Sequence, residues 1–345
     1  MNWPHVRGVP VAVLAIAALL GAGALTVVAA GLGRSVPWSG GVAGDQRFGM
    51  VVTNHQDLSR TLQTLHTPWY IDQGYRPDPG QPPGSHRALK VRTKDLETAA
   101  NLRAAALAQP GSYWIIGNEP NVPGQDDRTP DEYAQAFRYY YRTIRSVDPS
   151  ARFVGPELLN FDATCQGCGG FVSGRAWLDG FRTAYRDRYA DDPPVDVWSL
   201  HTYDMDWTHL PMGDAALQTA QISAFRSYLD SVPASAGHPI WLTEFAIVWG
   251  YSGVEWRGDG DQRRAFPVGE FQRESASTYL RTMLTWLTAN SAAEKIERWF
   301  AFSSHGYKDP WAGSVGGIAL VEATESGPRP TSFCEIMKEF AGRAR

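Results

Sequence analysis

Two glutamates stand where apolar, aromatic runs of the chain end. Glu119 lies near the end of residues 114–121 (WIIGNEPN), and Glu244 lies near the end of residues 241–245 (WLTEF). A carboxylate at the carboxyl end of a buried strand is held rigidly, and Pro120 restricts the first glutamate further. Paired carboxylates of this kind suit glycoside hydrolysis, one as acid/base and the other as nucleophile or general base. A gap of about 5–5.5 Å between them gives retention of configuration, and about 6.5–9.5 Å gives inversion.

The elements that must position this pair form a repeated pattern. Short apolar runs are each followed by a polar, often Gly- or Pro-bearing loop and then by a helical pattern, which indicates an α/β fold. The predicted strands are residues 48–52, 69–71, 88–91, 113–117, 152–155, 195–200, 240–243 and 298–302. The glutamates are about three units apart, at the fourth and seventh strands, as a (β/α)8 TIM barrel would place them. An open doubly wound sheet is the alternative, but no Gly-rich phosphate turn follows a strand.

Helices are predicted most clearly in the later part of the chain. One begins at Thr129, a suitable N-cap followed by Pro130, and runs to Val147. Further helices are expected at residues 176–189, 215–229 and 271–290, and none in the Pro- and Gly-rich residues 73–85.

Around the two glutamates the sequence resembles a known group of enzymes. The segments GNEP (117–120) and LTEF (242–245), in that order and spacing, resemble the strand-four and strand-seven signatures of clan A glycoside hydrolases. The resemblance extends over most of residues 46–340. It implies a retaining mechanism without metal or cofactor, in which Glu119 is the acid/base, Glu244 is the nucleophile and Asn118 binds the sugar 2-hydroxyl.

Two further strand ends contribute candidate site residues. His201 and Tyr203 share one face of the sixth strand by its two-residue period. The resemblance implies that they orient the nucleophile and line the pocket. It also implies that Trp299 is a sugar platform, although the usual position is nearer the end of the eighth strand. Glu157, just after the fifth strand, is a further carboxylate that could reach the cleft or have a structural role.

Aromatic residues give the remaining candidates for substrate binding. Trp69 and Asp72, at the end of the second strand, are candidates that could face a sugar or have a structural role. Trp249 follows the seventh strand in a Gly-rich loop, together with Tyr251 and Trp256. Aromatic rings stack on the apolar faces of sugars, so these rings would form subsites, with simple loop packing as the alternative.

Composition limits the other classes of protein. The 345 residues carry a formal net charge of −4, which gives no general attraction to nucleic acid. With 13 Trp, 14 Tyr and 14 Phe and only 20% charged residues, the chain is neither disordered nor collagen-like. Cys165 and Cys168 predict a short-loop disulfide, with free thiols as the alternative, and no fourth ligand in a zinc-site spacing is evident.

The amino terminus predicts export. Residues 8–33 carry no charge and are flanked by Arg7 and Arg34. The run is long enough to span a membrane and longer than the core of a usual signal peptide. Residues 1–33 are therefore expected to be a signal anchor, with a cleaved signal peptide as the alternative. Residues 34–45 are expected to be a linker, and residues 46–345 a single catalytic domain outside the cell, anchored or secreted.

These features together predict a retaining glycoside hydrolase that cleaves β-linked bonds of an extracellular oligo- or polysaccharide by double displacement. The expected partners are a carbohydrate substrate and, if residues 1–33 are uncleaved, a membrane; the domain is expected to be monomeric and to bind no nucleic acid. One alternative is a transglycosylase with the same two glutamates, and another is a non-catalytic glycan-binding protein on the same barrel. The sequence leaves the sugar, the linkage and endo or exo action open.

Overall fold

The structure, a computed structural model, describes residues 45–55, 57–167, 170–248, 251–259, 264–309, 313–315 and 318–343. The predicted signal anchor at residues 1–33 and nearly all of the predicted linker lie outside this range. In the part of the chain that the structure describes, no helix combines the length and apolarity that a membrane span requires.

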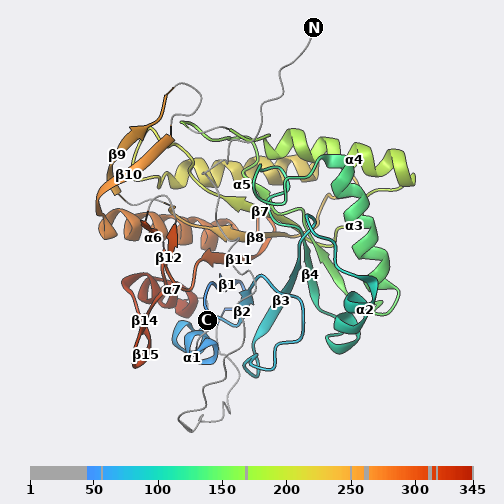
Figure 1. The fold of residues 1–345 in the computed structure, drawn as a ribbon, viewed down its shortest axis with the longest axis horizontal. Helices are drawn as coiled ribbons and strands as arrows, with labels where there is room; N and C mark the ends of the chain where they lie inside the picture. The colour runs from blue at the N-terminus through green and yellow to red at the C-terminus, as the bar shows by residue number, and fades with distance from the viewer. Residues whose placement is uncertain are drawn as a thin grey trace.

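A curled sheet of nine parallel strands forms the centre of the molecule (Figure 1), in the order β5-β4-β3-β2-β1-β11-β8-β7-β6. Its strands are β1 (Phe48–Val51), β2 (Trp69–Ile71), β3 (His86–Val91), β4 (Tyr113–Ile116), β5 (Arg152–Val154), β6 (Leu158–Leu159), β7 (Trp198–Thr202), β8 (Ile240–Phe245) and β11 (Ile296–Phe302). A parallel bridge between Val154 and Val197 brings β5 beside the start of β7, so the row of strands curls back on itself. The fold is TIM-barrel-like, all eight predicted strands are present, and β6 is an addition that was not predicted.

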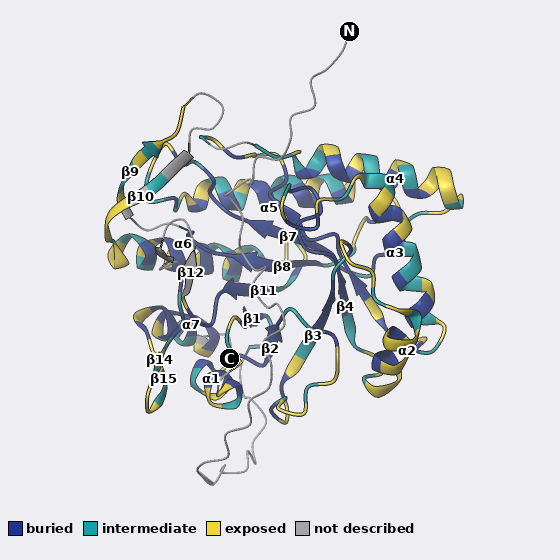
Figure 2. Cartoon of the chain, in the orientation of Figure 1, coloured by how far each residue is buried: buried dark blue, intermediate teal, exposed yellow. Residues whose placement is uncertain are grey.

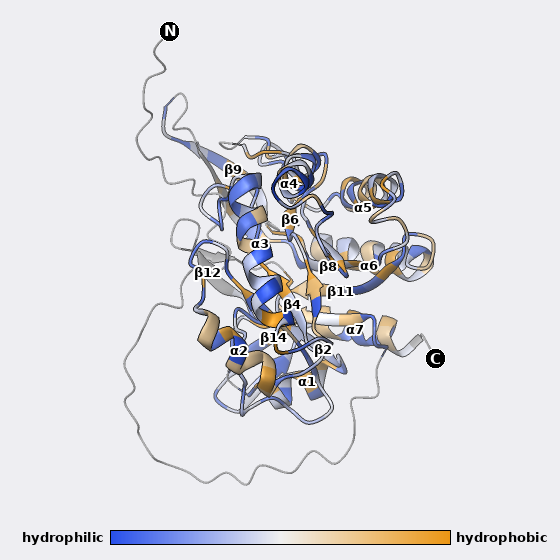
Figure 3. Ribbon diagram, turned by 90° about the vertical axis from the view of Figure 1, so that its right-hand side faces the viewer, coloured by the Kyte–Doolittle hydropathy of each residue, from blue (hydrophilic) through white to orange (hydrophobic). Residues whose placement is uncertain are grey.

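Helices surround this sheet on the outside (Figure 1). They are α1 (Leu58–Leu65), α2 (Ala99–Ala108), α3 (Pro130–Arg145), α4 (Gly174–Tyr189), α5 (Ala215–Asp230), α6 (Arg273–Asn290) and α7 (Ser332–Arg343). Figure 2 shows the strands of the central sheet mostly buried and the helices buried on one side only. Figure 3 shows polar residues along α3 and apolar residues in the strands behind it. The four predicted helices are confirmed, and residues 73–85, between β2 and β3, contain no helix, as predicted.

The first turn of α3 shows why the sequence located this helix well. The Thr129 hydroxyl accepts a hydrogen bond from the Glu132 amide, and the Glu132 carboxylate accepts one from the Thr129 amide. This capping box satisfies two amides that the helix itself cannot pair, and Pro130 at the first position needs no partner.

The segment after β8 differs from the prediction of a loop. β9 (Tyr251–Arg257) pairs antiparallel with β10 (Arg264–Phe271), and this hairpin stands apart from the main sheet at the edge of the molecule (Figure 1). Two further short hairpins follow β11: β12 (Tyr307–Asp309) with β13 (Gly313–Val315), and β14 (Val321–Thr324) with β15 (Gly327–Pro330). Each hairpin contains Gly or Pro, which are depleted in strands, so local patterns favoured loops here.

The cysteines take different forms. Cys165 is disulfide-bonded, while its neighbour in the predicted pair, Cys168, lies outside the described residues. Cys334 is a buried free thiol in α7.

Candidate active site

Glu119 lies in the loop after β4, in an uncommon backbone conformation. It has a φ of 44°, in the left-handed region, and follows Gly117 with a φ of 86°. A non-glycine residue in this region is strained by sterics, and such strain persists where the surrounding structure fixes it. The side chain is completely buried. The local turn therefore directs the carboxylate inward from the carboxyl end of the strand.

Two side chains fix this loop to the rest of the fold. Asp126 accepts hydrogen bonds from the Asn118 amide at 3.1 Å and from the backbone amide of Thr93 at 2.6 Å. Asn121 accepts from the Leu159 amide and donates to the Leu159 carbonyl, both at 3.0 Å, and so binds the loop to β6. The strained conformation of Glu119 is thus held from both sides.

Glu244 lies within β8, where a β-bulge sets its direction. The register against β7 passes from Leu200↔Leu242 to His201↔Glu244, so one extra residue, Thr243, is accommodated in β8. The pairing of β8 with β11 shifts at the same place. A bulge turns the side chains that follow it to the opposite face. Glu244 consequently points into the sheet's interior with only 1% of its surface exposed.

His201 and Tyr203 hold the two carboxylates from β7 and its end. The distance from His201 Nδ1 to Glu119 Oε1 is 2.9 Å, and to Glu244 Oε2 it is 3.6 Å. The Tyr203 hydroxyl donates to Glu244 Oε2 at 2.9 Å. One carboxylate oxygen of Glu119, one of Glu244 and a nitrogen of His201 lie within 4.8 Å of one another. The structure therefore brings together the four residues that sequence spacing could only assign to strand ends.

The cluster contains two further charged residues. The sequence left Glu157 between the cleft and a structural role, and it did not predict Lys90. Lys90, in β3, is 2% exposed, and its Nζ lies 2.7 Å from Glu157 Oε2 and donates to Asn118 Oδ1 at 3.0 Å. Glu157 is completely buried, and its Oε1 lies 3.5 Å from His201 Nε2. A lysine in the apolar run of residues 88–91 was the available signal, since buried lysines are nearly always paired. Asn118 Nδ2 in turn donates to Gln125 Oε1 at 3.1 Å.

Electrostatic interactions in this buried cluster are strong. Burial lowers the pKa of His201, but Glu244, Glu157 and the hydrogen bond to Glu119 raise it more, to about 10. Burial raises the pKa of Glu157, but Lys90 and His201 bring it down to about 2. Burial raises the pKa of Glu244, against the charges of His201 and Lys90, which lower it. These contacts favour the imidazolium form of His201 and the carboxylate form of Glu157.

The structure places Trp69 and Trp299 away from the cluster of Glu119 and Glu244. Trp69 stacks on His86 at a centroid distance of 4.8 Å and contacts Trp241, at the amino ends of the strands, where a cavity of about 470 Å³ opens. Trp299 is completely buried and packs edge-to-face on Phe48 at 4.9 Å. Neither ring lies with the carboxylates, which gather at the carboxyl ends. Trp249 lies outside the described residues.

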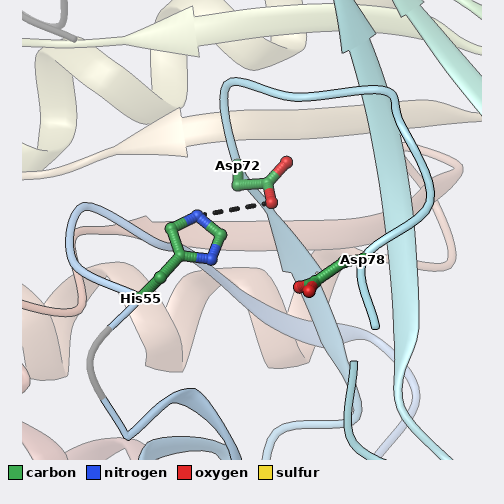
Figure 4. A group of neighbouring side chains, drawn as sticks. All are labelled: His55, Asp72 and Asp78. Carbon is green, nitrogen blue, oxygen red and sulfur yellow. Dashed lines mark ion pairs between the residues drawn. The ribbon is translucent and has the colours of Figure 1, made fainter. Parts of the chain in front are cut away.

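A second cluster of potential metal ligands lies at the carboxyl ends of β1 and β2 (Figure 4). His55 Nε2 lies 3.4 Å from Asp72 Oδ2, and Asp78 lies beside them. Arg87 Nη2 donates to the other oxygen of Asp72 at 2.9 Å, so this carboxylate is already neutralised. In the first cluster, His201 Nδ1 already lies 2.9 Å from Glu119 Oε1 and 3.6 Å from Glu244 Oε2, so a metal there would displace these pairings. Both arrangements favour ion pairing within the protein.

Comparison with known proteins agrees with this geometry. A search of curated protein sequences finds no significant match. Among solved structures, the chain is similar to a GH128 (subgroup II) endo-β-1,3-glucanase from Pseudomonas viridiflava, with 21% identity, a TM-score of 0.58, and coverage of 84% of this chain and 96% of that chain. It is also similar to a GH128 (subgroup I) endo-β-1,3-glucanase from Amycolatopsis mediterranei in complex with laminaritriose, with 20% identity, a TM-score of 0.55, and coverage of 86% and 100%.

A third solved structure has the same fold. It is a GH128 (subgroup III) curdlan-specific exo-β-1,3-glucanase from Blastomyces gilchristii in complex with glucose, with 18% identity, a TM-score of 0.53, and coverage of 85% and 97%. The sequence profile of a family described as "glycosyl hydrolase catalytic core" matches residues 89–325, which is more than half of the chain. The chain therefore belongs to the glycosyl hydrolase catalytic core family and is a glycosidase.

Proposed function

We propose that this protein is a retaining glycoside hydrolase that cleaves β-1,3-glucan, with Glu119 as acid/base and Glu244 as nucleophile. One observation carries the proposal: a carboxylate oxygen of Glu119 and one of Glu244 lie within 4.8 Å of each other. This upper limit for one pair of oxygens is nearer to the separation of about 5–5.5 Å in retaining enzymes than to the roughly 6.5–9.5 Å of inverting ones.

The hydrogen bonds of the two carboxylates support the division of roles. Glu244 Oε2 accepts the hydroxyl proton of Tyr203, and such a donor favours the ionised form that a nucleophile needs. Glu119 Oε2 has no hydrogen-bond partner among the described residues, so this oxygen is free to carry a proton to a substrate. His201 lies against both groups and couples them.

The reaction then takes two steps. In the first, an oxygen of Glu244 bonds to the anomeric carbon as the glycosidic bond breaks, and Glu119 gives its proton to the leaving oxygen. In the second, Glu119 takes a proton from water, the water oxygen bonds to the anomeric carbon, and Glu244 leaves as a carboxylate. Two inversions give net retention. The Asn118 side chain, which accepts from Lys90 Nζ at 3.0 Å, is proposed to bind the sugar beside the nucleophile.

The substrate class comes from the similar structures. All three are named as β-1,3-glucanases, two with endo and one with exo action, and the chain covers nearly their whole length. This likeness supports β-1,3-glucan over other β-glycans, while endo or exo action is left to experiment.

The test is digestion of β-1,3-linked gluco-oligosaccharides, with β-1,4-linked gluco-oligosaccharides as the matched control. We expect cleavage of the first set, with the β-anomer as the initial product by NMR. Glu119→Gln and Glu244→Gln are each expected to reduce the rate by at least about a thousandfold. Initial release of the α-anomer would refute the retaining mechanism, and undiminished activity of either variant would refute the assignment.

Two other functions remain distinguishable by the same experiment. A transglycosylase would use the same glutamates but pass the sugar to a second glycan, so longer oligosaccharides would appear at high acceptor concentration. A glycan-binding protein would form a complex without turnover, and the presence of both glutamates argues against it.

We also propose that residues 1–33 export the catalytic domain, as an uncleaved anchor or as a cleaved signal peptide. The intact mass of the mature protein distinguishes the two, since cleavage would remove these residues. Recovery of the full-length chain in the soluble intracellular fraction would refute export.

A further inference from the structure

Two buried charged residues form and break no bond in the two-step reaction. Lys90 and Glu157 are 2% and 0% exposed, and their charged atoms lie 2.7 Å apart. They come from β3 and from the segment after β5, on either side of β4, which precedes Glu119. Burying such a pair is rarely a gain in stability over apolar packing, so its position next to the proposed site calls for another explanation.

His201 connects this pair to the two proposed catalytic carboxylates. Its Nε2 lies 3.5 Å from Glu157 Oε1, while its Nδ1 lies 2.9 Å from Glu119 and 3.6 Å from Glu244. An imidazole with carboxylates on both sides is best satisfied when both nitrogens carry protons. Without Glu157, Nε2 would face no negative charge among these contacts, and the neutral form would be favoured by burial.

The charges of the cluster balance in one proton state. Lys90 and His201 supply two positive charges, and the three glutamates supply up to three negative ones. Tyr203 and Tyr133 also face the cluster as hydroxyl donors, Tyr203 to Glu244 Oε2 and Tyr133 to the Ile116 carbonyl. A buried cluster strongly prefers neutrality. Balance is reached when Glu119 and Glu244 share one proton.

We propose that Lys90 and Glu157 are positioning residues that hold His201 as an imidazolium and thereby set the Glu119–Glu244 pair to one proton. A single proton on the pair is the state that the proposed retaining reaction needs, one acid beside one nucleophile, so the inference rests on that proposed function. Lys90 has a second role in this arrangement, because it also fixes the Asn118 side chain.

The pH dependence of kcat/KM distinguishes this role from simple packing. In Glu157→Gln the negative charge on the Nε2 side of His201, opposite the Glu119–Glu244 pair, is removed with little change in shape. Every remaining group of the cluster then binds protons less tightly. The acidic limb, where the active state gains a proton, therefore moves to lower pH. The basic limb, where the active state loses a proton, moves in the same direction, and each shift is about one pH unit.

A double variant separates charge from shape. Lys90→Met combined with Glu157→Gln removes one charge of each sign, so both limbs are expected to return to within about 0.3 pH units of the wild-type positions. Asp148→Asn is the matched control: Asp148 is a buried carboxylate that accepts from the Gly111 amide, before β4 and away from the cluster. Its pH profile should be unchanged.

The charge of His201 can also be measured in the wild-type protein, without any variant or substrate. Imidazole nitrogen NMR shifts are expected to show both nitrogens protonated at pH 7 and above pH 8. A neutral His201 at pH 7, unmoved limbs in Glu157→Gln, or a double variant displaced as far as the single one would each overturn the proposal. Absence of β-glucan hydrolysis by the wild type would instead refute the proposed function, and the NMR titration would still decide the charge of His201.

Discussion

The hydrogen bond from Tyr203 to Glu244 gives the sharpest test of the proposed mechanism. Tyr203→Phe removes only the hydroxyl that donates to Glu244 Oε2 at 2.9 Å, in a fully buried position. A hydrogen bond to a charged acceptor contributes about 1.5–3 kcal/mol. In the second step Glu244 leaves the sugar and regains its charge, so the loss should slow that step by about ten- to a hundredfold.

Tyr203→Phe should also shift the pH dependence of kcat/KM in a defined direction. Burial already raises the pKa of Glu244, and loss of a donor to its ionised form raises it further. Because Glu244 must be ionised to attack, the acidic limb of kcat/KM should move to higher pH by about one to two units. This direction is opposite to that expected for Glu157→Gln, so the two variants check each other.

The assay is stopped-flow hydrolysis of an aryl β-glucoside or aryl β-1,3-oligoglucoside. If the second step becomes slow, the glycosyl-enzyme accumulates and an initial burst of aryl alcohol appears before the steady state. Tyr70→Phe is the matched control, since Tyr70 is also fully buried but its hydroxyl has no hydrogen-bond partner among the described residues. The reasoning would be refuted if Tyr203→Phe showed neither the burst nor the limb shift, or if Tyr70→Phe showed both.

Three further predictions follow from named contacts. Glu119→Gln should impair cleavage of natural glucan by at least about a hundredfold more than cleavage of an aryl glycoside with a good leaving group, since only the former needs protonation; equal loss in steady-state assays on both substrates would contradict the acid role. Trp69→Ala should lower the free energy of unfolding by about 3–5 kcal/mol in urea denaturation, because its contacts with His86 and Trp241 are lost, yet leave kcat/KM within about twofold; a large rise in KM would instead restore Trp69 to the substrate site. Thr129→Ala should cost about 1 kcal/mol of stability through the α3 capping box, measured as a lower Tm with unchanged kcat, and an unchanged Tm would count against the cap.

Much of the fold could be predicted because its signals are local. Each predicted strand is a short apolar run with turn residues at its ends, and the start of α3 is marked by Thr129, Pro130 and Glu132. The hairpin β9–β10 could not be predicted in this way, since Gly253, Pro267 and Gly269 favour a loop locally and only the pairing of the two segments makes them strands. The inward orientation of the Glu244 side chain could not be predicted either. Trp241 faces the interior, so a regular two-residue period would point Glu244 outward, and only the bulge at Thr243 reverses this.

The sequence by itself determined the kinds of elements, their order, and the two carboxylates at the ends of β4 and β8, because periodicity, caps and strand ends are properties of neighbouring residues. The tertiary structure alone decided which side chains meet. It placed Trp69 at the amino ends with other rings, Trp299 in packing against Phe48, and Lys90 beside Glu157. These outcomes depend on which face of each strand turns inward and how the strands curl together, and pairing between distant segments sets both.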